Sequence, residues 1–463
     1  MTGYAARVDL SGASPRPFWL DRPAPAEPAP PLEGAVGADL AIVGGGFTGL
    51  WAALLAKQEQ PQREIVLLES ETAGFGASGR NGGFVESSLT HGLLNGAARF
   101  PGELDALERL GEENLAGLRA DLRAHGIEAA WQEPGVLSVA TRPHELAELE
   151  EEAALLRRFG HRAEVLDRDA VRAQVASPTY LGAVWQRSGV ALVDPGALAL
   201  GLRRAVLALG VRVHERSPVV KARGSELTTP AGRVRAQRVL LATGAYPPLT
   251  RAIRRLVAPV YDYVLVTEPL SAAQRAAVGW AAGQGISDRG NQFHYYRLTP
   301  DGRILFGGYD AVYHFGNRVD PRLDRRPATF EALAVHLLAT FPALEGIGIT
   351  HAWGGAIDTC SRFCVTFGRA LGGRAVYAVG YTGLGVGASR FGARTALDLL
   401  DGADTERTRL RLVRSRPLPF PPEPARWAVI QATRAALARA DARGGRRGPW
   451  LRLLDRLGLG FDS

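Results

Sequence analysis

The pattern that points most directly to chemistry is Gly44, Gly46 and Gly49, which have the spacing GxGxxG. In the dinucleotide-binding fingerprint, the first glycine permits a tight turn and the second lets backbone approach a pyrophosphate. The third lets a helix pack closely on a strand. Glu69 follows at about the distance where a carboxylate accepts hydrogen bonds from a ribose diol. The expected ligand is a dinucleotide whose pyrophosphate lies at a helix N-terminus.

The surrounding sequence predicts the elements that this chemistry needs. The apolar run 39–43 predicts a strand, the Ala/Leu-rich run 50–57 predicts a buried helix, and 64–68 predicts a second strand that ends at Glu69. A glycine turn alone is weak support, because ordinary strand–helix turns also use glycine. The agreement of strand, turn, helix, strand and terminal acid favours the dinucleotide site.

A second glycine cluster follows at 72–84. It is too rich in glycine for the interior of a helix or strand, and it contains Ser78, Arg80 and Asn81. One alternative is a flexible surface loop. The polar side chains favour a loop that lies against a flat ligand.

A third glycine cluster lies at 380–387, between an apolar strand expected at 374–379 and a helix expected at 389–400. It repeats the arrangement of a glycine turn at a helix N-terminus. The strand that ends at Thr243 and Gly244 offers another point where backbone can approach a cofactor.

Composition limits the classes of protein. A chain of 463 residues, 46% hydrophobic and 22% charged, can form two or three globular domains. The net charge is +8, but Lys57 and Lys221 are the only lysines and the arginines are interleaved with acidic residues. Nucleic-acid-binding proteins gather basic residues on one element. No nucleic-acid partner is therefore expected.

The cysteines and the hydropathy pattern indicate an intracellular protein. Cys360 and Cys364 are the only cysteines, which argues against a disulfide framework, and we expect both in the core and no metal site. No apolar run approaches the ~18 residues of a membrane span. The expected location is cytoplasmic.

Aromatic-rich segments predict a second, antiparallel sheet. The segments 257–269, 291–298 and 303–309 read as strands, separated by turns such as Pro300–Gly302. A helix is expected at 327–341.

These motifs, in this order, resemble the FAD-dependent oxidoreductases of the D-amino-acid oxidase and sarcosine oxidase (DAO) family, and most closely its gamma-glutamylputrescine oxidoreductase-like members. The resemblance covers about 36–415. It implies an α/β fold in which a FAD-binding Rossmann-like domain of the glutathione-reductase type carries an inserted antiparallel or mixed-sheet substrate domain. The motifs are GGGFTG at 44–49, Glu69, GFGASGRNGGF at 74–84, LLATGA at 240–245 and VGYTGLGVG at 379–387.

The resemblance also implies domain boundaries. The first 35 residues are a proline-rich extension that should be extended and build no core, with Phe18–Leu20 as an anchor on the body. The FAD-binding domain is expected at 36–125, 186–257 and 351–415, the substrate domain at 126–185 and 258–350, and a basic helical tail at 416–463.

The family likeness implies that FAD takes a hydride from a carbon that bears an amine, which gives an imine that water hydrolyses. The protein then has to hold the amine neutral and in line. One alternative is an NAD-linked reductase, which offers no reason for the two later glycine clusters. Another is a flavin-binding electron-relay or structural subunit of a larger complex.

By this resemblance the cofactor contacts fall in six stretches. The three glycine clusters and Glu69 hold the cofactor, and Val220 lies near the adenine. The expected FAD-binding residues are Gly44, Gly46, Phe47, Thr48, Gly49, Glu69, Ser70, Ser78, Gly79, Arg80, Asn81, Gly82, Gly83, Val220, Thr243, Gly244, Gly380, Thr382, Gly383, Leu384 and Gly385.

Departures from the family pattern predict how FAD is held and what is oxidised. Gly355 stands where some relatives carry a flavin-linked cysteine, and 78–83 lacks the histidine that others use, so FAD should be non-covalent. Gly387 and Phe306 stand where small-amino-acid oxidases carry lysines for the substrate carboxylate and for oxygen. A larger amine substrate is therefore expected, with O2 or a quinone as electron acceptor.

Candidate catalytic residues lie on 293–297. His294 is a possible base and Tyr296 a possible active-site tyrosine; the alternatives are a core histidine and a packing tyrosine. Tyr295 and Tyr296 point to opposite faces of a strand, so only one can face the flavin. For Glu86 the alternative is a surface carboxylate. The expected substrate contacts are Glu86, Arg297, Trp353 and Tyr381.

The basic tail has two interpretations. Its arginines, Trp427, Trp450 and leucines suit a helix that lies on a membrane surface. Its lack of a long apolar face favours packing on the rest of the protein.

Overall fold

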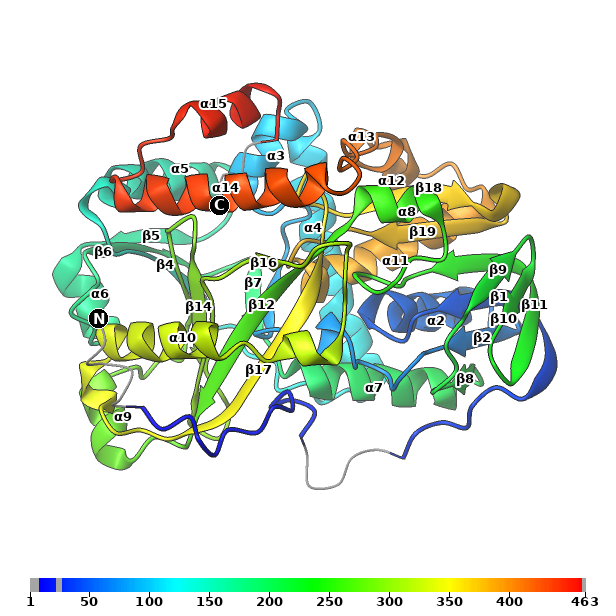
Figure 1. Ribbon diagram of the computed structural model, residues 1–463, viewed down its shortest axis with the longest axis horizontal. Coiled ribbons are helices and arrows are strands. Elements are labelled where there is room, and N and C mark those ends of the chain that lie inside the picture. Colours follow the sequence, from blue (N-terminus) through cyan, green and yellow to red (C-terminus); the bar gives the residue numbers. More distant parts are fainter. Residues whose placement is uncertain (1–7, 22–26, 460–463) are drawn as a thin grey trace.

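The computed structural model describes residues 8–21 and 27–459. Two large sheets lie side by side, as Figure 1 shows. The short strands β3 (Phe84–Glu86) and β7 (Val190–Leu192) pair with each other and form a small third sheet.

The first sheet carries the dinucleotide motif. Its central strands run in the order β18–β19–β11–β1–β2–β8, and neighbours from β19 to β8 are parallel. The expected strand 39–43 is the end of β1, and β2 ends one residue before Glu69. Its members are β1 (Gly34–Val43), β2 (Ile65–Leu68), β8 (Arg212–His214), β9 (Lys221–Arg223), β10 (Glu226–Thr228), β11 (Gly232–Leu241), β18 (Thr366–Ala370) and β19 (Ala375–Val379).

Alternate residues of β1 sort into two cores, because successive side chains of a strand point to opposite faces. Leu40 and Ile42 pack under the helices α2, α4, α7 and α11. Ala41 and Val43 face the other core, together with residues of α8 and β10. The sheet is thus covered on both faces, as parallel sheets require.

The second sheet is mixed. Its order is β16–β12–β15–β14–β13–β4–β6–β5, and β17 also pairs with β12. The expected aromatic strands are β12, β14 and β15, and their mutual pairing is antiparallel as predicted. Its members are β4 (Val136–Ala140), β5 (Ala163–Leu166), β6 (Gly182–Gln186), β12 (Ala258–Thr267), β13 (Gly285–Asp288), β14 (His294–Leu298), β15 (Ile304–Gly308), β16 (Val312–Tyr313) and β17 (Ile349–Thr359).

One boundary differs from the expectation. β17 pairs with β12 from Ile349 to Thr359, so 351–359 belongs to the second sheet although 351–415 was assigned to the FAD-binding domain. The long antiparallel ladder satisfies the backbone of both strands and carries the chain back toward the first sheet.

The two faces of the second sheet have different neighbours. Tyr261, Tyr263 and Tyr296 pack with α10 in one core. Val264, Leu305 and Trp353 lie on the opposite face, in a cluster with Trp19. We call these the helix-covered face and the inner face.

The helices have the following bounds. They are α2 (Phe47–Glu59), α3 (Leu93–Arg99), α4 (Leu104–Ala124), α5 (Leu149–Arg158), α6 (Arg168–Gln174), α7 (Pro195–Ala208), α8 (Arg251–Leu256), α9 (Ala272–Val278), α10 (Pro327–Thr340), α11 (Gly385–Asp401), α12 (Glu406–Arg409), α13 (Arg411–Arg414), α14 (Ala425–Ala442) and α15 (Pro449–Arg456). Within the described ranges, none is long and apolar enough to cross a membrane.

The proline-rich extension does contribute to the core, contrary to expectation. Trp19 is 1% exposed, which confirms the anchor, but Ala29 and Leu32 are buried as well. The Leu32 N–H donates to Ser217 Oγ at 2.8 Å and the Ala29 N–H to the Glu215 carboxylate at 2.5 Å. The side chains of Ser217 and Glu215 therefore accept backbone N–H groups of the extension. Burial of these N–H groups without a hydrogen-bond partner would cost free energy.

The described part of the tail packs on the protein, as the packing interpretation predicts. Glu423 accepts hydrogen bonds from the Tyr313 hydroxyl at 2.5 Å and the Gly316 N–H at 2.9 Å. At the far end of α14, Asp441 accepts the N–H of Asn291 at 3.1 Å and of Gln292 at 3.0 Å. α14 therefore spans the upper edge of the second sheet in Figure 1.

Candidate cofactor and substrate site

The glycine turn after β1 is as tight as the fingerprint requires. Gly44 has φ +111°, and a Cβ on it would lie 2.3 Å from the Ala242 carbonyl oxygen. A Cβ on Gly49 would lie 1.9 Å from the Gly44 oxygen. Only glycine lets α2 start this close to β1 and β11.

Glu69 closes the opposite side of this turn. Its carboxylate accepts the Gly45 N–H at 2.6 Å, the Ser70 hydroxyl at 3.1 Å and the Glu71 N–H at 2.9 Å. Burial raises the pKa of Glu69, and these hydrogen bonds oppose the shift. The structure thus places the acid beside the glycine turn, where the sequence predicts it.

The second glycine cluster, which we call the 72–84 loop, touches the same turn. The Phe47 N–H, at the start of α2, donates to Ser78 Oγ at 2.9 Å. Asn81 shapes the loop: its amide donates to the carbonyls of Ala77 and Ser78, and its Oδ1 accepts the Gly83 N–H at 2.8 Å.

Side chains on the inner face of the second sheet donate hydrogen bonds to backbone carbonyl groups of this loop. Three of them accept side-chain N–H groups: Asn81 from Trp19 at 2.8 Å, Arg80 from Trp353 at 3.0 Å, and Gly83 from Arg297 at 3.3 Å. Trp353 and Arg297 therefore fix the loop.

Two expected ligand cations are engaged elsewhere. Arg80 donates to Asp324 at 2.6 Å and to the Gly354 oxygen at 2.9 Å. Arg297 also donates to the Val193 oxygen at 2.7 Å, and burial lowers its pKa to about 10. Both guanidinium groups tie protein segments together.

The third glycine cluster precedes α11. The Asp358 carboxylate accepts the Gly380 N–H at 2.6 Å, and burial raises its pKa to about 6. Cβ atoms added to Gly383 and Gly385 would meet almost nothing, the nearest atom being His91 Cε1 at 4.0 Å from Gly383. Open space therefore adjoins the N-terminus of α11, which begins at Gly385.

The expected substrate contact Tyr381 does not reach this space. Its hydroxyl accepts the Thr48 hydroxyl at 3.0 Å, and a Cβ on Gly392 would lie 2.1 Å from its oxygen. The residue is 6% exposed and packs between α2 and α11. Thr48 is likewise buried, so this pair joins two helices.

The remaining predicted cofactor residues lie at strand ends. Thr243 follows β11, and its buried hydroxyl has no hydrogen-bond partner among the described residues. An orphaned donor beside Gly44 is what a missing ligand would leave. The Val220 side chain is 63% exposed, just before β9.

Asp262 and Tyr295 form a pair on the inner face that the sequence analysis missed. The Tyr295 hydroxyl donates to Asp262 Oδ2 at 2.5 Å. The ring crosses Gly307 and touches the loop, since a Cβ on Gly82 would lie 2.7 Å from Tyr295 Cε2. Burial raises the pKa of Asp262 to about 6. An Asp within the apolar run VYDYVLV was the available signal.

His294 and Tyr296 lie on the helix-covered face. His294 pairs with Asp288 at 2.6 Å and His336 at 2.9 Å, and Tyr296 bonds Tyr180 at 2.8 Å. The alternation of the strand turns them away from the 72–84 loop and brings Tyr295 there instead.

Phe306 also lies on the helix-covered face, stacked on Tyr296 at 4.9 Å. The side chain at the position where some relatives carry a lysine for oxygen therefore points away from the 72–84 loop.

Glu86 shares a face of β3 with Phe84, whose ring packs edge-on against Tyr295 at 5.9 Å. No hydrogen bond to its carboxylate occurs within the described residues, and burial raises its pKa. The partly buried Glu86 is therefore not a surface carboxylate.

His91, a second residue that sequence reasoning missed, lies by Gly383, and burial lowers its pKa to about 4.

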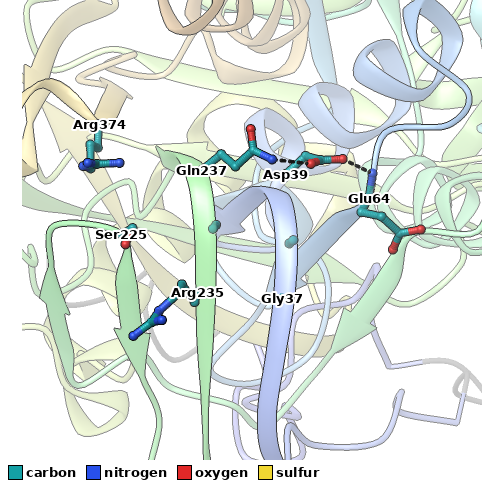
Figure 2. A pocket seen from close by; sticks show the side chains of 9 residues that line it. Gly37, Asp39, Glu64, Ser225, Arg235, Gln237 and Arg374 are labelled. Carbon is teal, nitrogen blue, oxygen red and sulfur yellow. Dashed lines mark hydrogen bonds between the residues drawn. The ribbon is translucent and has the colours of Figure 1, made fainter.

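Figure 2 shows a pocket on the first sheet, away from the carboxyl ends of its parallel strands, where the glycine turn lies. Asp39 there accepts the Gln237 amide at 2.8 Å and the Glu64 N–H at 2.9 Å. Ligands of open parallel sheets bind at the carboxyl ends of the strands, so this pocket is not the dinucleotide site.

Both cysteines are buried, as expected, and Cys360 Sγ contacts the carbonyls of Cys364 and Gly380. Of the residues described, no group of three or more His, Cys, Asp and Glu is arranged to hold a metal ion.

Comparison with known proteins agrees with this geometry. Residues 39–399 match the family described as FAD dependent oxidoreductase (DAO). The chain is 34% identical over 391 residues to gamma-glutamylputrescine oxidoreductase of Escherichia coli (strain K12), which covers 81% of this chain and 86% of that protein. It is 26% identical over 341 residues to sarcosine oxidase subunit beta of Rhizobium meliloti (strain 1021), which covers 69% and 74%.

Among solved structures, glycine oxidase from Geobacillus kaustophilus has a similar fold, with a TM-score of 0.65 at 21% identity over 80% of this chain and 96% of that one. The Gly44 turn, Glu69 and the unpaired Thr243 hydroxyl fit the pyrophosphate and ribose of FAD. The chain belongs to the FAD dependent oxidoreductase (DAO) family.

Proposed function

We propose that this enzyme oxidises a carbon–nitrogen bond of an amine that has no carboxylate next to the reacting carbon, with FAD bound non-covalently. The observation that carries the proposal is the charge of the inner face. Asp262 bonds Tyr295 on this face, and Glu86 of β3 lies next to it, on the same side as Phe84. Arg80 pairs with Asp324, and Arg297 donates through Nη1 to the Gly83 and Val193 carbonyls, while its Nη2 has no partner among the described residues.

This charge distribution selects against amino acids. A substrate carboxylate needs fixed cationic donors, and a charge-assisted hydrogen bond contributes about 1.5–3 kcal/mol. Gly387 supplies no side chain, and a Cβ there would lie 2.2 Å from the backbone carbonyl oxygen of Glu86. A cationic amine instead finds two carboxylates.

The chain's own residues would hold the cofactor in three places. The Gly44 turn and Glu69 suit the pyrophosphate and ribose, the 72–84 loop the flavin ring, and the α11 N-terminus the ring's developing negative charge. Bound FAD supplies the hydride acceptor. The protein excludes water, orients the amine and removes its proton; water then hydrolyses the imine product.

The similarity to gamma-glutamylputrescine oxidoreductase supports an amine of this kind, because the name of that enzyme specifies a putrescine derivative. The test is anaerobic mixing of purified protein with diamines, N-acylated diamines, N-methyl amines, glycine and D-amino acids. We expect bleaching of the flavin band at about 450 nm by the diamine derivatives. Bleaching by glycine or sarcosine alone contradicts the proposal.

Non-covalent attachment rests on the site residues. Gly355 lies against Arg80, with a Cβ position 3.1 Å from Arg80 Cδ, and the 78–83 segment has no nucleophilic Cys or His. Cys360 is buried against backbone carbonyls. Acid precipitation should release all yellow colour into the supernatant; colour in the pellet contradicts this attachment.

The electron acceptor is proposed to be a quinone. Reduction of O2 begins with formation of superoxide, which a nearby cation stabilises. Phe306 faces away from the loop, Arg80 is paired with Asp324, and Arg297 donates through Nη1 to the Val193 carbonyl. Stopped-flow reoxidation should be slower with air-saturated buffer than with a soluble quinone, and the opposite order overturns this part.

A further inference from the structure

Asp262 occupies an opening in the inner face of the second sheet. Its cross-strand neighbour on β17 is Gly355, and the next inner-face residue on β15 is Gly307. Because neither has a side chain, Tyr295 can lie across Gly307 and reach Asp262 Oδ2. Asp262 and Tyr295 keep intermediate exposure, whereas Tyr261 and Tyr296 beside them are buried.

The surroundings favour a carboxylate that meets a cation. Asp262 Oδ1 accepts the Tyr263 N–H at 2.9 Å, and the Gly308 N–H also supports the carboxylate. The titratable groups near it are His294 from β14, which lowers the Asp262 pKa, and Glu86 on β3, which lies beyond Phe84. The Arg80 side chain covers Gly355 on this face and is paired with Asp324.

The chemistry requires a proton acceptor at this place. An alkyl amine has a pKa of about 10 and reaches the enzyme as an ammonium ion. An ammonium nitrogen has no lone pair to support loss of hydride from the neighbouring carbon, so one N–H proton must leave first.

We propose that Asp262, oriented by Tyr295, receives the ammonium group of the substrate and takes its proton before the carbon–nitrogen bond is oxidised. The inference rests on the proposed function and names the base within it. An N–H bond breaks and an Asp262 O–H bond forms, so the carboxylate becomes a neutral acid and the ammonium a neutral amine. The hydride then leaves the carbon for the flavin, and the acid later returns its proton to solvent.

Asp262 suits this role better than the other carboxylate. Tyr295 holds one of its oxygens in a fixed direction beside Gly82, in the loop expected along the flavin. The pKa of Asp262 is about 6, below that of the amine and near the working pH, which is where a general base is effective. Glu86 lacks a comparable orienting donor among the described residues and suits a second cationic group of the substrate.

The test is the pH dependence of kcat/KM for the best amine, measured with the holoenzyme from about pH 5 to 10. The wild-type value should rise through a pKa of about 6 to a plateau. Asp262→Asn should lower it about 10²–10³-fold near pH 7. In this variant it should rise about tenfold per pH unit up to about pH 9, because only the neutral amine reacts.

Two further variants separate a chemical role from a structural one. Tyr295→Phe removes a hydrogen bond that stabilises the carboxylate, so the acid limb of the profile should move to higher pH. Tyr180→Phe removes a buried hydroxyl on the helix-covered face and should leave the profile unchanged.

A binding measurement gives a readout independent of turnover. The probe is tert-butylamine, which has no hydrogen on the carbon that bears nitrogen and so cannot be oxidised. Calorimetry with the oxidised holoprotein should show affinity about tenfold or more weaker for Asp262→Asn than for wild type.

The outcomes are distinct. If no amine bleaches the wild-type flavin, the proposed function fails and this inference fails with it. If wild type is active but Asp262→Asn keeps its pH profile and its affinity for tert-butylamine, the inference alone is overturned. A shift in Tyr180→Phe equal to that in Tyr295→Phe also overturns it.

Discussion

The two halves of the site are built by different means. At the first sheet, the backbone shapes the site. Gly44 and Gly49 make a turn in which no Cβ fits, and three donors fix the Glu69 carboxylate. On the other side, side chains define the site: Asp262 and Tyr295 stand on the inner face of the second sheet, and Glu86 stands on β3, on the same face as Phe84, which packs against Tyr295.

This difference separates the residues that bind the cofactor from the residues that determine the reaction. A backbone cradle accepts a common cofactor and leaves little freedom to vary. A face of side chains changes its chemistry when single residues change. Substitutions in the glycine turn and at Glu69 should therefore weaken or remove the cofactor, and those on the inner face should change reactivity while FAD stays bound.

The largest effect is expected at Gly49. In Gly49→Ala the new methyl would meet the Gly44 oxygen at 1.9 Å, and backbone must move. We expect a loss of about 3 kcal/mol or more in stability and protein purified without FAD. Gly37→Ala, on β1, is the control, because nothing lies within 4 Å of its Cβ position. Flavin absorbance per protein and thermal unfolding measure both; equal FAD content would break the comparison.

Glu69 should give the next largest effect. Glu69→Ala removes the acceptor at the Gly45 N–H and the expected partner of the ribose, worth about 1.5–3 kcal/mol. The FAD dissociation constant should rise at least tenfold. Glu64→Ala, which loses an exposed carboxylate near the start of β2, should leave it unchanged. An unchanged constant in Glu69→Ala would remove Glu69 from the site.

Asp262→Asn should raise stability while lowering activity. Burial raises the folded-state pKa of Asp262 to about 6, so the folded protein binds this proton more tightly than the unfolded chain does. Stability from this group is therefore full at low pH and declines as pH rises toward about 6. The variant should gain about 1–3 kcal/mol near pH 8 and nothing near pH 4. Urea unfolding at both pH values checks this; a loss at pH 8 contradicts it.

The smallest effect is expected on the helix-covered face. Tyr180→Phe leaves the Tyr296 hydroxyl without its 2.8 Å partner and should cost about 1 kcal/mol. Activity and FAD content should stay at wild-type values. A large fall in kcat would show that this face takes part in the reaction.

The cofactor half was readable from sequence because its signals are local. The GxGxxG turn, the strand before it and Glu69 are close in the chain, and each restricts backbone conformation. The glycine clusters at 72–84 and 380–387 are equally local signals. The structure places the first against the Gly44 turn through the Phe47–Ser78 hydrogen bond.

The substrate half was not readable in the same way, because it depends on strand register and on long-range contacts. A shift of one residue exchanges the faces, and this alternation separates Tyr295 from the expected Tyr296. Tyr381 was expected at the substrate but bonds Thr48, far away in sequence. The position of Asp262 in the site depends on Tyr295 and on two glycines from other strands, and the sequence around Asp262 does not show these contacts.

The most direct test of the central claim is anaerobic titration of the purified yellow protein with an N-acylated diamine, followed at about 450 nm. Wild-type protein should bleach fully, glycine and sarcosine should have little effect, and Asp262→Asn with the same FAD content should bleach far more slowly near neutral pH. Full bleaching by glycine, or equal rates for wild type and Asp262→Asn, would contradict the account.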